Sequence, residues 1–193
     1  VERVRTKYSE FLKKFPNVRA LACASLKEVL AAWSGLGYNR RALYVRTAAE
    51  KIVQNHNGKI PADVEILKTL PGIGHATASA ICAFAFNMPT VFIETNIRSV
   101  FIHFFFEKRR VVRDSEIMRL VARTADKKDP RTWYYALMDY GVMLKKLHKN
   151  PSRKSAHHTR QSPFENSDIK IRGQILKKLV KQDPVRTATL ARM

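Results

Sequence analysis

A glycine-rich turn between two helical segments is the feature of this sequence that most constrains its fold. The turn reads Leu70-Pro71-Gly72-Ile73-Gly74. Pro61 suits the first turn of a short helix that ends near Thr69, and the alanine-rich residues 76–86 predict a second helix. Two glycines one residue apart at the start of a helix expose consecutive backbone N–H groups beside the positive end of the helix dipole. We therefore expect the turn to bind an anion such as a phosphate, although Gly-x-Gly also occurs in tight turns that bind nothing.

Most of the remaining sequence is also helical in pattern. Residues 25–33 carry apolar side chains at i, i+3, i+4 and i+7 spacing, and Ser25 with Glu28 forms a capping box. Thr90–Ile93 is the best candidate for a strand, and it is short. These patterns predict an all-α fold. Further helices are expected at residues 39–53, 115–125, 131–147 and 169–180, with another beginning at Thr187.

The charge of the chain narrows its partners. Its 193 residues include 36 Lys and Arg against 16 Asp and Glu, a net charge of +20. A chain this basic is typical of proteins that bind polyanions, most often nucleic acid. A basic surface that serves solubility and an anionic membrane are the alternatives, but no segment forms a clean basic amphipathic helix with an aromatic face.

Two cysteines limit the possible metal chemistry. Cys23 and Cys82 allow one disulfide at most and cannot hold a four-thiolate zinc or iron–sulfur site. His157-His158 is interpreted as part of a polar basic loop. The longest apolar stretches are too short to span a bilayer, and the first residues are not a signal peptide. Cys82 and Phe104–Phe106 are expected in the core.

Glu94 is the first acidic residue after the glycine turn. It follows the apolar run Val91–Ile93 at the expected start of another helix. On residue type alone, the simpler explanation is that Glu94 caps that helix together with Thr95 and Asn96. The intervening helix could nevertheless place Glu94 near a DNA backbone held by the glycine turn.

Several motifs, in order, resemble one known family. Trp33-Ser34-Gly35-Leu36-Gly37-Tyr38, Leu70–Ala80 and Met138-Asp139-Tyr140-Gly141 are similar to motifs of the helix–hairpin–helix DNA glycosylases, the superfamily of endonuclease III. Within that superfamily the resemblance is greatest to the MutY-type adenine glycosylases. It covers roughly residues 1–147.

The resemblance implies a fold and a domain organisation. We expect a helix–hairpin–helix glycosylase barrel over residues 1–147, incomplete at its N-terminus. A basic loop at residues 148–163 would replace the region that holds an iron–sulfur cluster in many relatives. Residues 164–193 would form a helical extension, the possible start of a winged helix.

The resemblance also implies a reaction. The expected enzyme hydrolyses the N-glycosidic bond of a mispaired purine, adenine opposite 8-oxoguanine or guanine. Glu94 lies where the family has an Asp that stabilises the cationic sugar. Ala76 lies where bifunctional relatives carry a Schiff-base lysine, which implies a monofunctional enzyme. The general-acid Glu of the family is expected ahead of Val1.

Further implications concern ligands and partners. The expected partner is double-stranded DNA, with no membrane, and the protein is expected to be a cytoplasmic monomer, nucleoid-associated if bacterial. No cofactor is expected. Lys145, Ser152, Ser155 and Gln161 lie near the positions where many relatives have the four cysteines of an iron–sulfur cluster, and none of the four can supply a thiolate, so no cluster is expected. Tyr38 is interpreted as a residue that stacks on DNA, with a core tyrosine as the alternative. The full set of expected DNA contacts is Leu36, Gly37, Tyr38, Gly72, Ile73, Gly74, His75, Thr77, Asn96 and Arg98.

Two other functions stay open at this point. The chain could be a DNA-binding module without catalysis. It could also be a glycosylase for another base, such as uracil, thymine or hypoxanthine.

Overall fold

The computed structural model describes residues 2–159 and 167–181, with the side chains of residues 4–159 and 167–180. The chain divides into two compact units. The first unit comprises Val1–Pro61, Leu70–Gly72 and Gln161–Met193. The second comprises Ala62–Thr69 and Ile73–Arg160. The expected helix from Thr187 lies outside the described residues.

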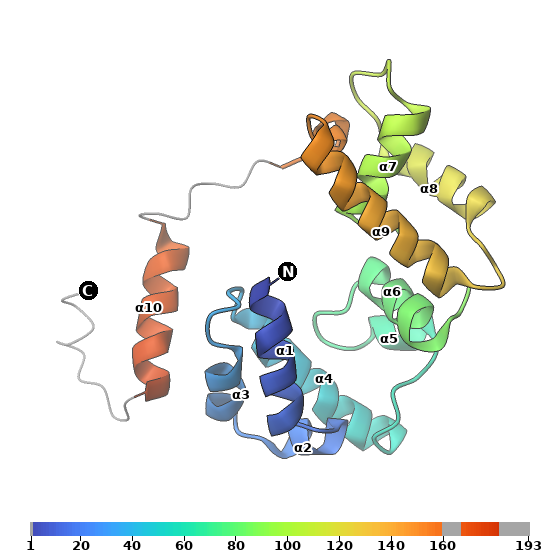
Figure 1. Cartoon of the computed structure of the whole chain (residues 1–193). Helices are drawn as coiled ribbons and strands as arrows, with labels where there is room; N and C mark the ends of the chain where they lie inside the picture. Colours follow the sequence, from blue (N-terminus) through green and yellow to red (C-terminus); the bar gives the residue numbers. More distant parts are fainter. Residues whose placement is uncertain (1, 160–166, 182–193) are drawn as a thin grey trace. The chain divides into compact units, whose positions relative to one another are not determined.

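The first unit contains five described helices (Figure 1). Its core gathers Phe15 and Leu21 around Val29 of α3, with Ala42 and Ala49 of α4. Ser25 caps α3 through the predicted capping box, in which Glu28 N donates to Ser25 Oγ at 3.2 Å. The helices are α1 (Glu2–Lys14), α2 (Val18–Cys23), α3 (Leu26–Trp33), α4 (Arg40–His56) and α10 (Asp168–Lys181).

The second unit is also built from helices. Its core is formed by Phe92, Ile97, Phe101 and Tyr134 with aliphatic residues of α7 and α8. Helices α7 and α9 pack along each other (Figure 1). The elements are α5 (Val64–Lys68), α6 (His75–Phe86), α7 (Thr95–Phe105), α8 (Asp114–Thr124), α9 (Pro130–Leu147) and the 3₁₀-helix η1 (Pro151–Lys154).

The predicted all-α fold is confirmed, with three local corrections. Thr90–Ile93 is not a strand, and the one β-type pairing in the described part of the chain is an isolated bridge between Val112 and Ser155. The short helix before the turn begins at Val64, because Asp63 caps it by accepting from Ile66 N at 2.8 Å, and Pro61 lies ahead of it.

The third correction concerns the phenylalanine run. Phe104 and Phe105 are 56% and 55% exposed, and Phe106, just after the helix end, packs against the core. Consecutive helical residues point about 100° apart, so three in a row cannot share one buried face. Cys82 is buried as expected.

Candidate functional site

Glu94 is the N-cap of α7. Its Oε1 accepts hydrogen bonds from Asn96 N at 2.5 Å and Ile97 N at 2.9 Å. The capping explanation is therefore confirmed. Capping does not exhaust the carboxylate, because an ionised carboxylate offers about four acceptor positions. Glu94 is half-buried, and its Oε2 accepts one hydrogen bond within the described part of the chain, from Asn96 Nδ2 at 3.4 Å.

The segment that leads to Glu94 is held by a buried tyrosine. Tyr134 of α9, fully buried, donates from its hydroxyl to Thr90 O at 2.8 Å and accepts from Phe92 N at 3.3 Å. Its ring stacks on Phe92 with 4.2 Å between centroids. Burial raises the pKa of this hydroxyl. Thr90 also donates to Ser79 O of α6 at 2.8 Å, so two helices fix the approach to Glu94.

A lysine of α9 completes the surroundings of Glu94. Lys145 Nζ donates to Asn96 Oδ1 at 2.6 Å. Partial burial lowers the pKa of Lys145, the nearby charge of Glu94 raises it, and that of Arg98 lowers it. No local pattern in the sequence indicated this contact, because Lys145 and Asn96 lie 49 positions apart in the chain.

Arg98, a predicted DNA contact, is engaged within the protein. Its guanidinium binds Asp114 through two hydrogen bonds, Nε to Oδ1 at 2.8 Å and Nη2 to Oδ2 at 2.7 Å. These bonds hold the pKa of Asp114 below its usual range. Ser155 Oγ lies 3.4 Å from the same carboxylate. Nothing in the sequence indicated this pairing, which ties α7 to α8; a contact of Arg98 with DNA stays a prediction.

The glycine turn has the conformation that an anion site needs. Gly72 has φ +74°, and a β-carbon there would come within 3.0 Å of the Tyr44 ring. Gly74 is the N-cap of α6, where no described side chain caps the helix, so the first-turn amides have no intrahelical acceptor. Gly72, Gly74, His75, Ala76 and Thr77 are exposed, and Ile73 is half-buried.

His75 links the turn to the segment that carries Glu94. Its Nε2 lies 3.3 Å from Val91 O, three residues before Glu94. The start of α6 and the approach to α7 are thus joined within the second unit. The structure therefore brings the predicted residues His75, Glu94, Asn96 and Arg98 into one region of this unit.

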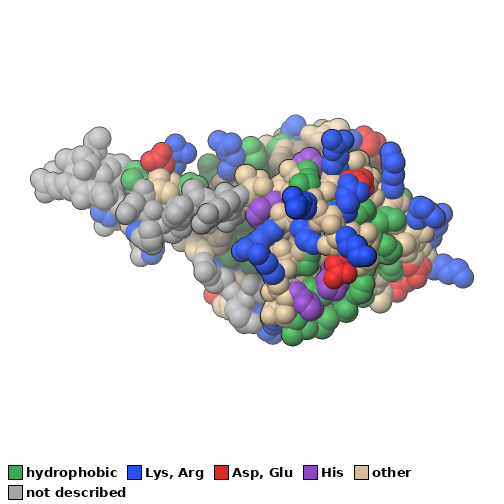
Figure 2. Space-filling view, turned by 90° about the horizontal axis from the view of Figure 1, so that it is seen from above, with side chains coloured by type: hydrophobic (Ala, Val, Ile, Leu, Met, Phe, Trp, Pro, Cys, Tyr) green, Lys and Arg blue, Asp and Glu red, His purple; other side chains and the backbone are tan. Residues whose placement is uncertain are grey.

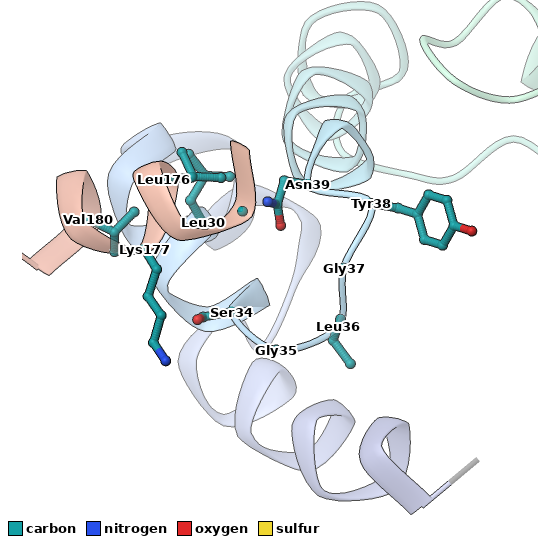
Figure 3. A pocket seen from close by; sticks show the side chains of 11 residues that line it. Leu30, Ser34, Gly35, Leu36, Gly37, Tyr38, Asn39, Leu176, Lys177 and Val180 are labelled. Carbon is teal, nitrogen blue, oxygen red and sulfur yellow. The ribbon is translucent and has the colours of Figure 1, made fainter. Parts of the chain in front are cut away.

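The predicted loop Gly35–Tyr38 belongs to the first unit. Gly35 and Gly37 have φ of +94° and +73°, and Trp33 Nε1 donates to Gly37 O at 3.0 Å. Tyr38 is 60% exposed, with φ +50°, and projects away from α10 (Figure 3). The alternative of a core tyrosine is wrong. Leu36 is half-buried.

A pocket of about 580 Å³ lies on the other side of this loop. Leu30 of α3 lines it together with Ser34 and Asn39 at the two ends of the loop, and Leu176, Lys177 and Val180 line it from α10 (Figure 3). It is an apolar groove between helices of the same unit.

None of the four positions expected to replace cluster cysteines carries a thiol. Ser152 and Ser155 are buried hydroxyls, and Ser152 Oγ donates to Asn150 Oδ1 at 2.8 Å. Lys145 is bound to Asn96, and Gln161 lies outside the described residues. Residues 2–159 and 167–181 contain no group of three His, Cys, Asp or Glu side chains that could hold a metal ion. Cys23 and Cys82 are both free thiols.

Hydrogen bonds to the loop between α7 and α8 hold the segment after α9 in place. Val112 N donates to Lys154 O at 2.9 Å, Ala156 N donates to Val112 O at 2.8 Å, and Lys154 Nζ donates to Glu107 O at 2.6 Å.

Lys and Arg side chains are widespread on the face that Figure 2 shows, with few acidic neighbours. The exposed basic residues of the second unit include Lys108, Arg109, Arg110, Arg113, Lys146, Lys149 and Arg153.

Two helices joined by a glycine turn, with no described side chain capping the second helix and with His75 contacting the segment that leads to a helix-capping carboxylate, define a helix–hairpin–helix protein suited to a polyanionic ligand. Comparison with known families agrees with that class. The profile described as "HhH-GPD superfamily base excision DNA repair protein" matches residues 1–126, about two thirds of the chain. The chain belongs to this superfamily, as the resemblance of its motifs predicts.

Similar proteins of known sequence include DNA glycosylases. An adenine DNA glycosylase of Mycobacterium tuberculosis is 41% identical over 98 residues, 51% of this chain and 32% of that protein. One of Buchnera aphidicola is 33% identical over 148 residues, 75% of this chain and 41% of that protein. A thymine/uracil-DNA glycosylase of Pyrobaculum aerophilum is 32% identical and covers 72% of this chain and 64% of that protein. The chain thus spans well under half of the two adenine glycosylases.

Solved structures show the same fold. A thermostable thymine-DNA glycosylase superposes with a TM-score of 0.65 at 19% identity, over 78% of this chain and 71% of that one. Endonuclease III in a trapped covalent complex with DNA superposes with a TM-score of 0.58 at 18% identity, over 89% and 76%. In the described residues, no helix is both long and apolar enough to cross a membrane.

Proposed function

We propose that this protein is a DNA glycosylase that hydrolyses the N-glycosidic bond of a mispaired adenine, opposite 8-oxoguanine or guanine. The observation that carries the proposal is the fixed carboxylate of Glu94, whose Oε2 is not used in capping α7. A carboxylate held in this way can stabilise positive charge on a deoxyribose as the base departs. The bond from C1′ to the base breaks as a general acid protonates the base; water then adds to C1′ and gives up a proton to solvent.

The glycine turn supplies the grip on DNA in this proposal. The amides of the Gly72–Gly74 turn and of the first turn of α6 bind a backbone phosphate, with His75 and Thr77 beside them. Lys and Arg residues add salt-dependent affinity for double-stranded DNA. The exposed ring of Tyr38 stacks on a base next to the lesion. Asn96 lies beside Glu94 and contacts the flipped nucleotide.

The proposed enzyme is a cluster-free monomer without a lyase step. Ala76 is exposed at the start of α6 and has no amine to form a Schiff base. The buried Ser152 is bonded to Asn150 and the buried Ser155 to Asp114 of α8, which supports an organisation of the segment after α9 that uses no iron–sulfur cluster.

A second candidate is removal of thymine or uracil. It is favoured by the similarity to the Pyrobaculum thymine/uracil-DNA glycosylase, of which this chain covers a larger share than of the two adenine glycosylases. The third candidate, a DNA-binding module without catalysis, keeps the glycine turn and assigns Glu94 only its capping role.

Single-turnover base release on a panel of duplexes separates the three candidates. The full natural protein is incubated with duplexes containing A·8-oxoguanine, A·G, T·G, U·G and hypoxanthine·T. Release of adenine without strand cleavage or a borohydride-trapped adduct is the expected result. Release of thymine or uracil alone would establish the second candidate. Salt-dependent binding with no release from any duplex would overturn the enzyme and leave the module.

A further inference from the structure

We propose that Lys145 is a positioning residue for Glu94, acting through the side-chain amide of Asn96. The inference rests on the proposed role of Glu94 and adds a residue to it. Lys145, Asn96 and Glu94 form a continuous chain of contacts within the second unit. Lys145 Nζ lies 2.6 Å from Asn96 Oδ1, and Asn96 Nδ2 lies 3.4 Å from Glu94 Oε2.

The chemistry of the three groups fixes how the amide of Asn96 is turned. A lysine ammonium only donates hydrogen bonds, and an ionised carboxylate only accepts them. An amide between them therefore has one favourable orientation, with oxygen toward Lys145 and nitrogen toward Glu94. Without Lys145, only the contact with Glu94 still favours this orientation, and the amide can rotate away from the carboxylate.

The burial of Lys145 separates it from an ordinary surface lysine. Lys145 is half-buried, whereas the next residue, Lys146, is exposed. Placing an ammonium in a partly desolvated position is unfavourable, and hydrogen bonds and opposite charge must offset that cost. The described partners that can do so are Asn96 and Glu94.

The other charged or titratable residues near the Lys145–Asn96–Glu94 contacts are on α6, α7 and α8. Arg98 of α7 also lies near Lys145 and is paired with Asp114 of α8. His75 of α6 contacts the segment that precedes Glu94. Because the guanidinium of Arg98 is held by Asp114, Lys145 is the cation whose hydrogen bond leads to Glu94 through Asn96.

Matched variants on one helix test the proposal. Lys145→Met removes the donor, Lys145→Arg keeps a cationic donor, and Lys146→Met removes a neighbouring exposed charge as the control. Base release is measured under single turnover at saturating protein, together with the affinity for the duplex. Lys145→Met should slow release about 10- to 100-fold, as expected for a misplaced catalytic group, with affinity changed by less than about threefold.

The control variants separate the effect of a cationic donor at position 145 from the effect of surface charge in general. Lys145→Arg should recover most of the rate that Lys145→Met loses. Lys146→Met removes a charge from the exposed basic surface, so it should act mainly by a slight, salt-dependent loss of DNA affinity and slow release at saturating protein far less than Lys145→Met does. Equal release rates for wild type and Lys145→Met would overturn the proposal. So would a loss in Lys145→Met that appears only as weaker DNA binding.

A measurement independent of activity keeps the proposal distinct from the proposed function. In lysine-¹³Cε NMR spectra, Glu94→Gln should lower the pKa of Lys145, because the Glu94 charge raises it, and should leave Lys146 unaffected. The side-chain amide signals of Asn96 should shift in Lys145→Met but not in Lys146→Met. If wild type released no base, these spectra would still test the contact. Unchanged Lys145 and Asn96 signals would overturn it.

Discussion

Gly141 of α9 lies directly against the backbone carbonyl of Asn96 in α7. A β-carbon added at Gly141 would come within 3.0 Å of Asn96 O, a distance that real side chains essentially never show. The glycine lets α9 approach the first turn of α7, and this approach brings Lys145 to Asn96 one turn further along α9. The Met138–Gly141 motif therefore has a structural reason that lies next to Glu94.

Gly141→Ala is expected to destabilise the protein and disturb the candidate site together. Because the obstructing atoms are backbone, the helices must move apart, at a cost of about 1–3 kcal/mol in the free energy of unfolding. Urea denaturation measures the loss. Gly173→Ala, at a helical glycine with open space around it, is the control and should be neutral or slightly stabilising. Equal stability of the two variants would contradict the close approach of α9.

The ion pair between Arg98 and Asp114 should contribute to stability as a unit. Asp114→Asn and Arg98→Met are each expected to lower the free energy of unfolding by about 1–3 kcal/mol, since each leaves a partly buried charge without its partner. The double variant should lose less than the sum of the two. A double variant that loses the full sum would show that the two residues are not coupled.

The same pair predicts a dependence of stability on pH. Arg98 lowers the pKa of Asp114 in the folded state. The stabilising contribution of the pair is therefore fully present at pH values above the unfolded-state pKa of an Asp, about 4. It is lost as pH falls through the lower folded-state pKa. The Tm difference between wild type and Asp114→Asn should be large at pH 6 and shrink in this acidic range. A difference independent of pH would contradict the assignment.

The two turn glycines should separate stability from DNA binding. Gly72→Ala should lower stability by about 1–3 kcal/mol, because φ is +74° and Tyr44 blocks the added carbon. Gly74→Ala meets open space at φ −90°, so it should stay within about 1 kcal/mol of wild type. Its methyl group would obstruct a phosphate, so duplex affinity measured by fluorescence anisotropy should fall about tenfold. Unchanged affinity in a folded Gly74→Ala variant would exclude the turn from the interface.

Tyr38→Ala should weaken binding to a mispaired duplex, measured by fluorescence anisotropy, without harming the fold. The ring is exposed, so stability should change by no more than about 0.5 kcal/mol. Loss of a stacking ring should reduce affinity for a mispaired duplex by about 1–3 kcal/mol, and Tyr38→Phe should retain it. An equal loss in both variants would assign the effect to the hydroxyl rather than to stacking.

Local patterns in the sequence predicted the helices well. The Ser25–Glu28 capping box, the apolar spacing of α3 and the alanine-rich α6 are short-range features, and each helix is present. Asn57-Gly58, a residue pair typical of turns, has both residues at positive φ just after α4. Pro61 misled because the side chain of Asp63 makes the stronger start signal two residues later. Thr90–Ile93 misled because an extended segment needs a partner strand, and here Tyr134 and Ser79 hold it instead.

The site could be predicted in part. The residue types of Gly74 and Glu94 indicated positions at helix starts, and the structure has both as N-caps; their roles in DNA binding and catalysis stay predictions. The contacts of Lys145 with Asn96 and of Asp114 with Arg98 join residues 49 and 16 positions apart, so no local pattern indicates them. They depend on how α9 and α8 pack against α7, which the close approach at Gly141 sets in part.

The release of adenine by Glu94 variants tests the central claim most directly. Glu94→Gln keeps the capping oxygen and removes the charge, so the fold should be retained at a cost of about 0.3–1 kcal/mol. On an A·8-oxoguanine duplex, single-turnover release should fall by about 100-fold or more, while Glu94→Asp keeps substantial activity. Adenine release by Glu94→Gln at the wild-type rate would contradict the account and leave Glu94 only as the cap of α7.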